Sequence, residues 1–290
     1  MRALPHVERE ECFALKGGTA INFFLWDMPR LSVDIDLTYL PIEPREESLR
    51  KISEALLRIK QAIEGALPRV KAHESKVGGL ASKLVVRGPD AEIKMEPNTV
   101  IRGTTGRPES RSLSKKASAM FELAVSARTL PESELLGGKI CAALDRQHPR
   151  DLFDVKQLLA GQGLTQAIRK GFLMHLISHD RPIHEVLDPV RKDVRALFED
   201  EFKEMTDEPV EYEALVNARE RLIARIKTDL TEPEKRFLLS LKKGKPDWPL
   251  LGLDGVEKLP AVQWKLQNIR KMAADKNIEQ LAKLQKVLGL

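Results

Sequence analysis

The sequence is poor in cysteine and in aromatic residues, and it contains no long apolar run. Its 290 residues include two cysteines, Cys12 and Cys141, which are too few for a disulfide framework or a cysteine-ligated zinc site. Aromatic residues make up 5% of the chain, which argues against a nucleic-acid surface built on base stacking. No apolar stretch approaches the roughly 18 residues that a membrane helix needs, so we expect no membrane partner.

The rest of the composition is typical of a globular protein. Hydrophobic residues make up 42% of the chain and charged residues 31%, and the length favours two domains. The N-terminal segment MRALPHVEREECFALKGG carries acidic residues where a secretory signal has its apolar region, which predicts a cytoplasmic protein.

Basic residues gather near the C-terminus, although the net charge is only +5. Between Lys258 and Leu290, seven Lys or Arg residues stand against two acids, and Arg236–Lys245 adds three lysines. A basic end attracts a polyanion larger than a mononucleotide, such as RNA. A solvated lysine-rich helix face would have the same composition, and both interpretations remain open at this point.

The stretch FALKGGTAINFFLWDMPRLSVDIDL, residues 13–37, carries the most information. Its apolar runs and its glycine and proline residues predict a strand at Phe13–Leu15, a turn at Gly17-Gly18, a helix at Thr19–Met28 and a strand at Val33–Leu37. The glycines allow the backbone to approach a polyanion closely, and the start of the following helix offers free N–H groups. This arrangement predicts a phosphate cradle.

Two acids alternate with apolar residues in the second of these strands. Period two places Asp34 and Asp36 on one face, while Val33, Ile35 and Leu37 point into the core. Two adjacent carboxylates repel each other unless a divalent cation lies between them. A phosphate cradle opposite such a metal site suits nucleotidyl transfer.

A later predicted strand carries acids that are candidates for a third carboxylate beside this pair. Leu80–Arg87 and Asp90–Pro97 have strand patterns and are joined at Gly88-Pro89-Asp90. Glu96 is the first candidate because Pro97 ends the strand beside it, and Glu92 is the alternative. Lys94 on the same face is a candidate phosphate contact, and an ordinary solvent-facing strand explains the pattern equally well.

Two cations share a helix face further along the chain. Pro131–Arg146 is predicted to be helical, with Gly137-Gly138 indicating close packing or a closely approaching ligand. Lys139 and Arg146 are seven residues apart and therefore lie on one face. A triphosphate bound across them would explain both cations, and a solvent-facing pair is the alternative. Asp151 and Asp154 follow in the first turn of the next predicted helix, where acids also favour the helix dipole.

The C-terminal part is almost wholly helical in pattern. The predicted helices are Thr165–Ile177, Val186–Phe202, Tyr212–Lys227, Glu232–Lys242, Ala261–Met272 and Asn277–Leu288. We therefore expect an α/β (α+β) core at residues 1–125, with a mixed sheet, and a helical lobe at residues 126–290.

The motifs resemble a known superfamily. A glycine pair followed by D-x-D resembles the signature of DNA polymerase β-type nucleotidyltransferases. KGGTA followed by Arg30, Ser32, Asp34 and Asp36 is similar, more narrowly, to the AbiEii/AbiGii toxins of type IV toxin–antitoxin and phage abortive-infection systems. KICAALDR followed by RDLFDV, at residues 139–155, resembles the later motifs of that family, and it departs from them by lacking the usual lysine just before Asp151. The resemblance covers residues 13–160.

The resemblance implies a set of roles. The metal ligands would be Asp34, Asp36 and Glu96, for Mg²⁺ or alternatively Mn²⁺. The nucleotide site for the substrate NTP would use Gly17, Gly18, Thr19, Arg30, Ser32, Lys139, Arg146 and Asp154. The catalytic residues would be Asp34, Asp36, Lys139 and Asp151. The acceptor would be the 3′ end of tRNA, which blocks translation, and a cognate antitoxin would neutralise the enzyme.

Three other functions are compatible with these motifs. One is transfer of AMP to a protein side chain, and another is transfer to a small molecule such as an aminoglycoside. The second would need an acidic pocket for its cationic substrate, and the C-terminal part is basic. The third is an inactive nucleotide- or RNA-binding regulator, against which the intact D-x-D argues.

Overall fold

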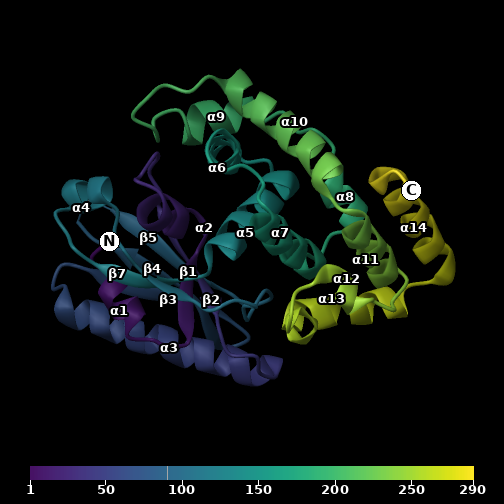
Figure 1. The fold of residues 1–290 in the computed structure, drawn as a ribbon. Helices are drawn as coiled ribbons and strands as arrows, with labels where there is room; N and C mark the ends of the chain where they lie inside the picture. The colour runs from purple at the N-terminus through teal and green to yellow at the C-terminus, as the bar shows by residue number, and fades with distance from the viewer. Residues whose placement is uncertain (90) are drawn as a thin grey trace. The chain divides into compact units, whose positions relative to one another are not determined.

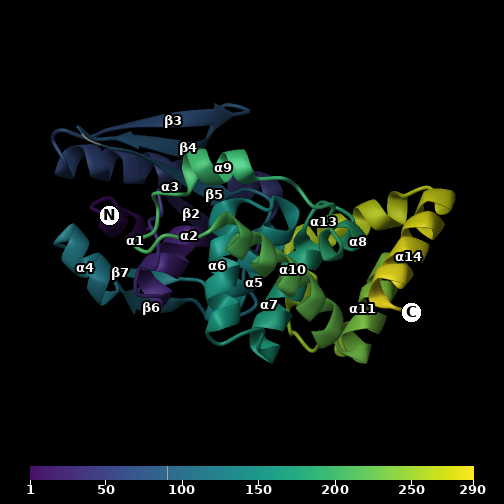
Figure 2. The ribbon, with the colours of Figure 1, turned by 90° about the horizontal axis from the view of Figure 1, so that it is seen from above.

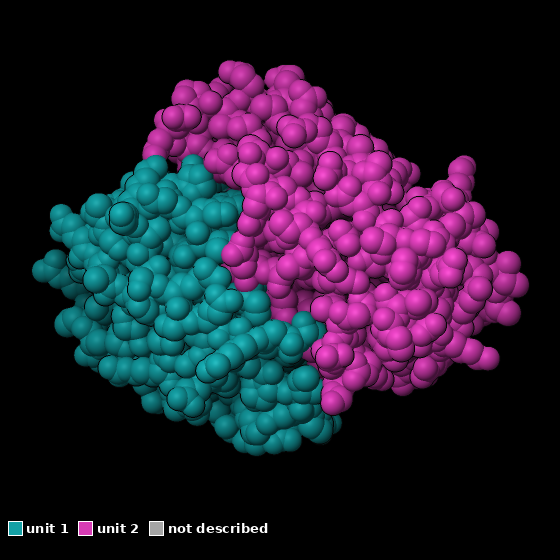
Figure 3. All heavy atoms as spheres, in the orientation of Figure 1, with its two compact units in different colours: residues 1–131 teal, residues 132–290 magenta. Residues whose placement is uncertain are grey.

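The computed structural model describes residues 1–89 and 91–290, which divide into two compact units (Figures 1 and 3). The units are Met1–Pro131 and Glu132–Leu290. Asp90, which the sequence places in a turn between two strands, lies outside the described residues. None of the described helices combines the length and the apolar character that a bilayer span requires.

The described part of the first unit is built on a mixed seven-stranded sheet in the order β3-β4-β5-β2-β1-β7-β6. The strands are β1 Phe13–Lys16, β2 Asp34–Tyr39, β3 Lys71–Val77, β4 Leu80–Arg87, β5 Glu92–Asn98, β6 Glu109–Ser112 and β7 Ser126–Thr129. β1 and β2 pair antiparallel, whereas β2–β5 and β1–β7 are parallel pairs. The mixed sheet confirms the predicted α/β class, and β7 joins it although it follows residue 125.

Helices cover this sheet or connect its strands. They are α1 Leu4–Glu8, α2 Gly17–Ala20, the π-helical turn η1 Ile21–Leu25, α3 Arg45–Ala66 and α4 Lys115–Phe121. α3 lies along β3 and β4 (Figure 2) and buries Ile52, Leu56, Ile59 and Ile63. These residues recur at helical spacing, so burial of one apolar face holds α3 on the sheet.

The central strand β2 shows the expected alternation over most of its length. Ile35 and Leu37 are buried, and Asp34 and Asp36 are half-buried on the other face. The prediction for Val33 was wrong, since its side chain is 47% exposed. β2 begins at Asp34, so Val33 lies in the preceding loop and not in the ladder.

The described residues of the second unit form helices joined by loops, without strands. Its helices are α5 Glu132–Asp145, α6 Pro149–Ala160, α7 Gln166–Ser178, α8 Ile183–Leu187, α9 Arg195–Glu201, α10 Tyr212–Asp229, α11 Glu232–Lys242, α12 Trp248–Leu251, the 3-10 turn η2 Val256–Lys258, α13 Pro260–Lys271 and α14 Ala274–Leu288. The single helix predicted at Val186–Phe202 is wrong, because the chain breaks between α8 and α9. Pro189 lies in that break and has no backbone N–H to continue a helix.

Glycines allow α5 and α7 to pack very closely. A Cβ at Gly137 would lie 2.2 Å from the carbonyl carbon of Gly171, and one at Gly171 would lie 2.0 Å from the Ser133 oxygen. Gly138 faces the ring of His175. Helix packing therefore explains the Gly137-Gly138 pair that the sequence left open between packing and a ligand.

Candidate active site

The glycine turn after β1 lies against the predicted metal and nucleotide residues. Gly17 has φ +69°, a conformation that favours glycine, and a Cβ there would be 2.2 Å from Oδ2 of Asp36. A Cβ at Gly18 would be 2.8 Å from Oγ of Ser32 and 3.0 Å from Nη2 of Arg30. The fold thus brings these five predicted residues together.

Thr19 fixes the turn to the start of β2. Its side chain is buried, and its hydroxyl donates to the backbone carbonyl of Asp34 at 2.5 Å and lies 3.1 Å from Oγ of Ser32. Arg30 is also buried and donates to the carbonyl of Leu31 at 2.7 Å. The Thr19 hydroxyl therefore serves the protein's own backbone, and the atoms left to a phosphate at this turn are mainly backbone N–H groups.

A lysine on a neighbouring strand pairs in register with each predicted metal ligand. Asp36 is the register partner of Lys16 on β1 and of Glu96 on β5, and Asp34 is the partner of Lys94. Side chains at paired positions lie on the same face of a sheet. Lys16 was not singled out from the sequence, although its position directly before the glycine pair is a usable signal.

The register separates the two candidates for a third carboxylate. Glu96 lies beside Asp36, whereas Glu92 precedes the paired segment and forms an ion pair with Arg87 at 2.5 Å. Glu96 is itself held by Nζ of Lys83 at 2.8 Å. The pKa of Lys83 is raised, first by this hydrogen bond and also by the charge of Asp34.

The predicted trio of metal carboxylates is not assembled in this structure. Among residues 1–89 and 91–290, no group of three or more His, Cys, Asp or Glu side chains is arranged to hold a metal ion. Lys83 holds one carboxylate oxygen of Glu96, so a metal role for Glu96 would use its other oxygen or follow a change in this ion pair. The pair Asp34 and Asp36 still fits Mg²⁺, which proteins commonly bind through one or two carboxylates together with substrate phosphates.

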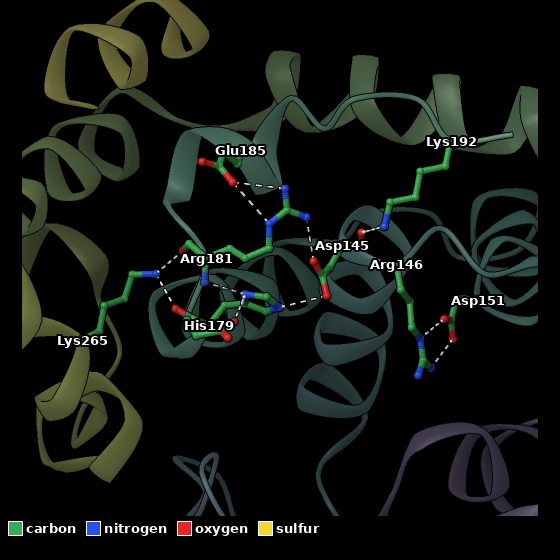
Figure 4. Close-up of polar contacts among 9 residues, drawn as sticks. Asp145, Arg146, Asp151, His179, Arg181, Glu185, Lys192 and Lys265 are labelled. Atoms are coloured by element: carbon green, nitrogen blue, oxygen red, sulfur yellow. Dashed lines mark hydrogen bonds and ion pairs between the residues drawn. The ribbon is translucent and has the colours of Figure 1, made fainter. Parts of the chain in front are cut away.

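A second cluster of predicted residues lies within the helical unit. Lys139 on α5 donates to Oδ1 of Asp151 at 2.6 Å and lies 3.0 Å from Oδ2 of Asp154, both on α6. Arg146 donates through Nε to Oδ2 of Asp151 at 2.5 Å and through Nη2 to Oδ1 at 3.1 Å (Figure 4). The fold therefore joins all four residues in one network.

Burial divides this network into an inner and an outer part. The side chains of Lys139, Asp151 and Asp154 are at most 5% exposed, whereas that of Arg146 is 62% exposed. The sequence suggested that a triphosphate explains the two cations on one face. Asp151 supplies an anion to both of them, so Lys139 is enclosed by protein and Arg146 alone presents its side chain to solvent.

The network keeps Asp151 ionised. Burial alone would raise the pKa of this carboxyl group, but the charge of Lys139 and the hydrogen bond from Arg146 reverse the effect and hold the pKa well below its usual range. A carboxylate with so low a pKa is a poor proton acceptor near neutral pH. The geometry therefore favours Asp151 as a positioning residue that orients Arg146.

We expect Gly17→Ala to impair both the turn and the site. The substitution places a Cβ in a positive-φ position and against Asp36, so the free energy of unfolding should fall by about 1–3 kcal/mol. Nucleotide transfer should fall at least about tenfold, equivalent to 1.4 kcal/mol of transition-state stabilisation, because the added Cβ displaces the carboxylate of Asp36. Urea denaturation and a transfer assay measure the two effects.

Gly65→Ala is the matched control for that substitution. Gly65 lies near the end of α3, and a Cβ there would meet nothing within 4 Å. This variant should keep full activity and gain up to about 1 kcal/mol of stability. Equal loss of activity in the two variants would contradict a specific role for the Gly17 turn.

Comparison with protein families decides the identity of the chain. The model of the nucleotidyl transferase AbiEii toxin family of type IV toxin–antitoxin systems matches residues 1–268. The chain belongs to the AbiEii family. The match confirms the resemblance carried by the motifs and extends well beyond residue 160, and it makes the protein a nucleotidyltransferase toxin of a type IV system.

A solved structure supports the same fold for this AbiEii protein. The chain is similar to MenT4, the nucleotidyltransferase toxin Rv2826c from Mycobacterium tuberculosis H37Rv, with a TM-score of 0.61 and 16% sequence identity. The similarity covers 92% of this chain and 89% of MenT4, so it includes both units. No curated protein sequence matches the chain.

Proposed function

We propose that this AbiEii protein transfers a nucleoside monophosphate from an NTP to the 3′ end of tRNA, using Mg²⁺ held by Asp34 and Asp36. The observation that carries the proposal is the contact between the glycine turn and the carboxylate strand, where Gly17 leaves no room for a Cβ beside Asp36. That turn can receive phosphates while the carboxylates receive the cation that accompanies them.

The reaction joins the acceptor hydroxyl oxygen to the α-phosphorus and breaks the α–β phosphoanhydride bond, so pyrophosphate leaves. Bound Mg²⁺ would neutralise charge that develops on the phosphates. The chain's own residues position the reactants. Backbone N–H groups of the glycine turn receive the phosphates of the NTP, and Ser32 and Arg30 support that turn by lying against Gly18.

In the second unit, the exposed Arg146 is proposed as a phosphate contact. Asp151 holds its guanidinium through two hydrogen bonds and so limits the orientations that it can adopt. Lys139 and Asp154 act indirectly by fixing Asp151. An Arg146→Ala variant should therefore raise the KM for NTP more than it lowers kcat.

An RNA acceptor is supported by the basic residues near the C-terminus. Lys258, Arg270, Lys271, Lys276, Lys283 and Lys286 are exposed, as phosphate contacts must be. Lys265 and Lys242 are buried and do not belong to this surface. We further propose that a cognate antitoxin neutralises the enzyme, as the membership in a type IV system implies.

The direct test uses each α-labelled NTP with Mg²⁺ and total cellular RNA, with protein alone as the control. We expect label on RNA of tRNA size, and no label when periodate has destroyed the 3′-terminal diol. Label on the protein itself would overturn the RNA acceptor in favour of transfer to a side chain. Co-expression with the neighbouring gene product should abolish labelling if that product is the antitoxin.

A further inference from the structure

The second unit contains a pocket that the nucleotidyl transfer described above does not use. It lies among α8, α11, α13 and α14 and encloses about 520 Å³, including solvent at its mouth. Much of this space is open solvent, and the enclosed part has room for a group of phosphate size. Its walls include Arg181, Lys242, Trp264, Lys265, Asn268 and Gln280.

Lys265 brings a buried charge to this pocket without a carboxylate partner. Its side chain is on α13, is 7% exposed, and donates to the backbone carbonyls of His179 at 2.5 Å and Arg181 at 2.7 Å (Figure 4). Carbonyl oxygens carry only a partial charge, so they solvate the ammonium group without neutralising it. The positive charge of Lys265 is therefore not neutralised by direct contact with a described carboxylate.

The acids around His179 and Arg181 contact those two side chains. Asp145 accepts from Arg181 at 2.8 Å and lies 3.5 Å from the ring of His179, and Glu185 lies 3.2 Å from Arg181 (Figure 4). Asp180, a largely exposed carboxylate of the pocket wall, lies 3.1 Å from Nδ1 of His179, and its charge also acts on Lys265. Asp145 and Glu185 thus neutralise the charge of Arg181, whereas Lys265 forms no ion pair with a described carboxylate.

Lys242 on α11 is a second buried lysine that neutral groups hold. It is 6% exposed, and its ammonium group lies 2.7 Å from Oε1 of Gln280 and 3.4 Å from Sδ of Met272, both of which are neutral. Within the described residues, no carboxylate forms an ion pair with Lys242 or Lys265. Buried charges without counter-ions are costly, so two of them in one pocket indicate an anionic ligand.

The pKa shifts of Lys265 and Lys242 agree with this arrangement. Burial lowers the pKa of Lys265 to about 8; the charges of Cys141 and Asp180 oppose this shift, and that of Lys242 adds to it. Burial also lowers the pKa of Lys242. A dianion placed near both ammonium groups would reverse these shifts, which means that its binding and their protonation favour each other.

The remaining walls suit a flat, polar group. The side chain of Trp264 is 48% exposed, an unusual exposure for so large an aromatic residue, and the amides of Asn268 and Gln280 supply donors and acceptors. We propose that this pocket binds the phosphate group of an organic phosphate, with the phosphate at Lys242 and Lys265 and an attached base against the exposed side chain of Trp264. A phosphate dianion matches two ammonium charges, which a single carboxylate does not.

The test measures AMP binding to the full-length protein by calorimetry, in EDTA and without divalent cations, so that the metal-dependent site contributes little. Lys242→Gln and Trp264→Ala should each weaken binding at least about tenfold, equivalent to 1.4 kcal/mol. Trp264 is on the surface, so its variant keeps the test valid if the lysine variant fails to fold. Lys286→Gln, which removes an exposed lysine of α14, is the matched control and should bind as the wild type does.

Two further binding measurements distinguish this pocket from the catalytic site. Asp36→Ala should bind AMP normally, and adenosine should bind at least about tenfold more weakly than AMP.

AMP affinity should also fall between pH 7 and pH 9 as Lys265 loses its proton near pH 8. The charged or titratable groups that face Lys265 or line its pocket are Cys141, Asp180, Arg181, His184 and Lys242. Unchanged affinity in both pocket variants, or loss of affinity in Asp36→Ala, would overturn the proposal.

Discussion

Replacing Asp36 by alanine is expected to reduce nucleotide transfer by at least about 10³-fold. Asp36 lies against the Gly17 turn, and a metal ligand at this position contributes several kcal/mol of charge stabilisation in the transition state. Because Asp36 is half-buried and not part of the core, the variant should unfold at the same urea concentration as the wild type. Transfer of label to RNA under single-turnover conditions measures the loss.

Two comparisons show whether that loss is specific. Glu54→Ala removes an exposed carboxylate of the same unit that pairs with Arg50 on the surface of α3, and it should leave transfer unchanged. Asp34→Ala should resemble Asp36→Ala and should show a weaker dependence on Mg²⁺ concentration than the wild type. Full activity in Asp36→Ala would exclude the proposed metal site, whatever the other variants do.

Much of the first unit was predictable because its central elements follow strong periodic patterns. The alternation in Asp34–Leu37 was interpreted correctly, and β4 has the predicted bounds. The polar strands were missed, as Lys71–Val77 shows: this segment, KAHESKV, lies at the edge of the sheet and buries only Ala72. An edge strand is held by backbone pairing with its neighbour, which leaves little trace in hydrophobic periodicity.

The predicted helix at Thr19–Met28 shows how local detail departs from a correct general pattern. The chain is helical there, but α2 ends at Ala20 and the next turn is π-helical over Ile21–Leu25. Trp26 N–H bonds the carbonyl of Ile21, five residues back, which widens the turn. Apolar spacing does not distinguish this turn from a regular helix, since both bury the same side chains.

The candidate site was predictable as a set of residues but not as a set of contacts. Lys139, Arg146, Asp151 and Asp154 were all selected from their motifs, yet the sequence did not show that Asp151 joins both cations. That pairing depends on how α5 packs against α6, a tertiary property. For the same reason, Lys83 could not be assigned to Glu96, because the register between β4 and β5 is not visible in the sequence.

The second large effect is expected from Lys139→Met. The substitution removes the buried ammonium group that both Asp151 and Asp154 contact, and breaking a buried ion pair in this way typically costs about 3–5 kcal/mol. Chemical denaturation of the second unit measures this loss. Lys203→Met, which removes an exposed lysine paired with Glu199 on the surface, is the control and should unfold as the wild type does.

The same network predicts a dependence on pH. The folded-state pKa of Asp151 lies below its ordinary value of 3.8, so the unfolded chain binds the proton more tightly. The stabilisation from this carboxylate is therefore complete above about pH 5 and is lost as the pH falls through and below 3.8. In Lys139→Met the pKa of Asp151 should rise, so stability should fall less between pH 5 and pH 2 than in the wild type.

A neutral replacement of the whole network separates its structural role from a chemical one. The triple variant Lys139→Met, Asp151→Asn and Asp154→Asn removes all three buried charges of the network, and such replacements are often neutral or stabilising. We expect stability to return to within about 1 kcal/mol of the wild type while transfer stays at least about 10²-fold reduced, because Arg146 loses its anionic support. Recovery of both stability and transfer would show that the network only holds α5 and α6 together.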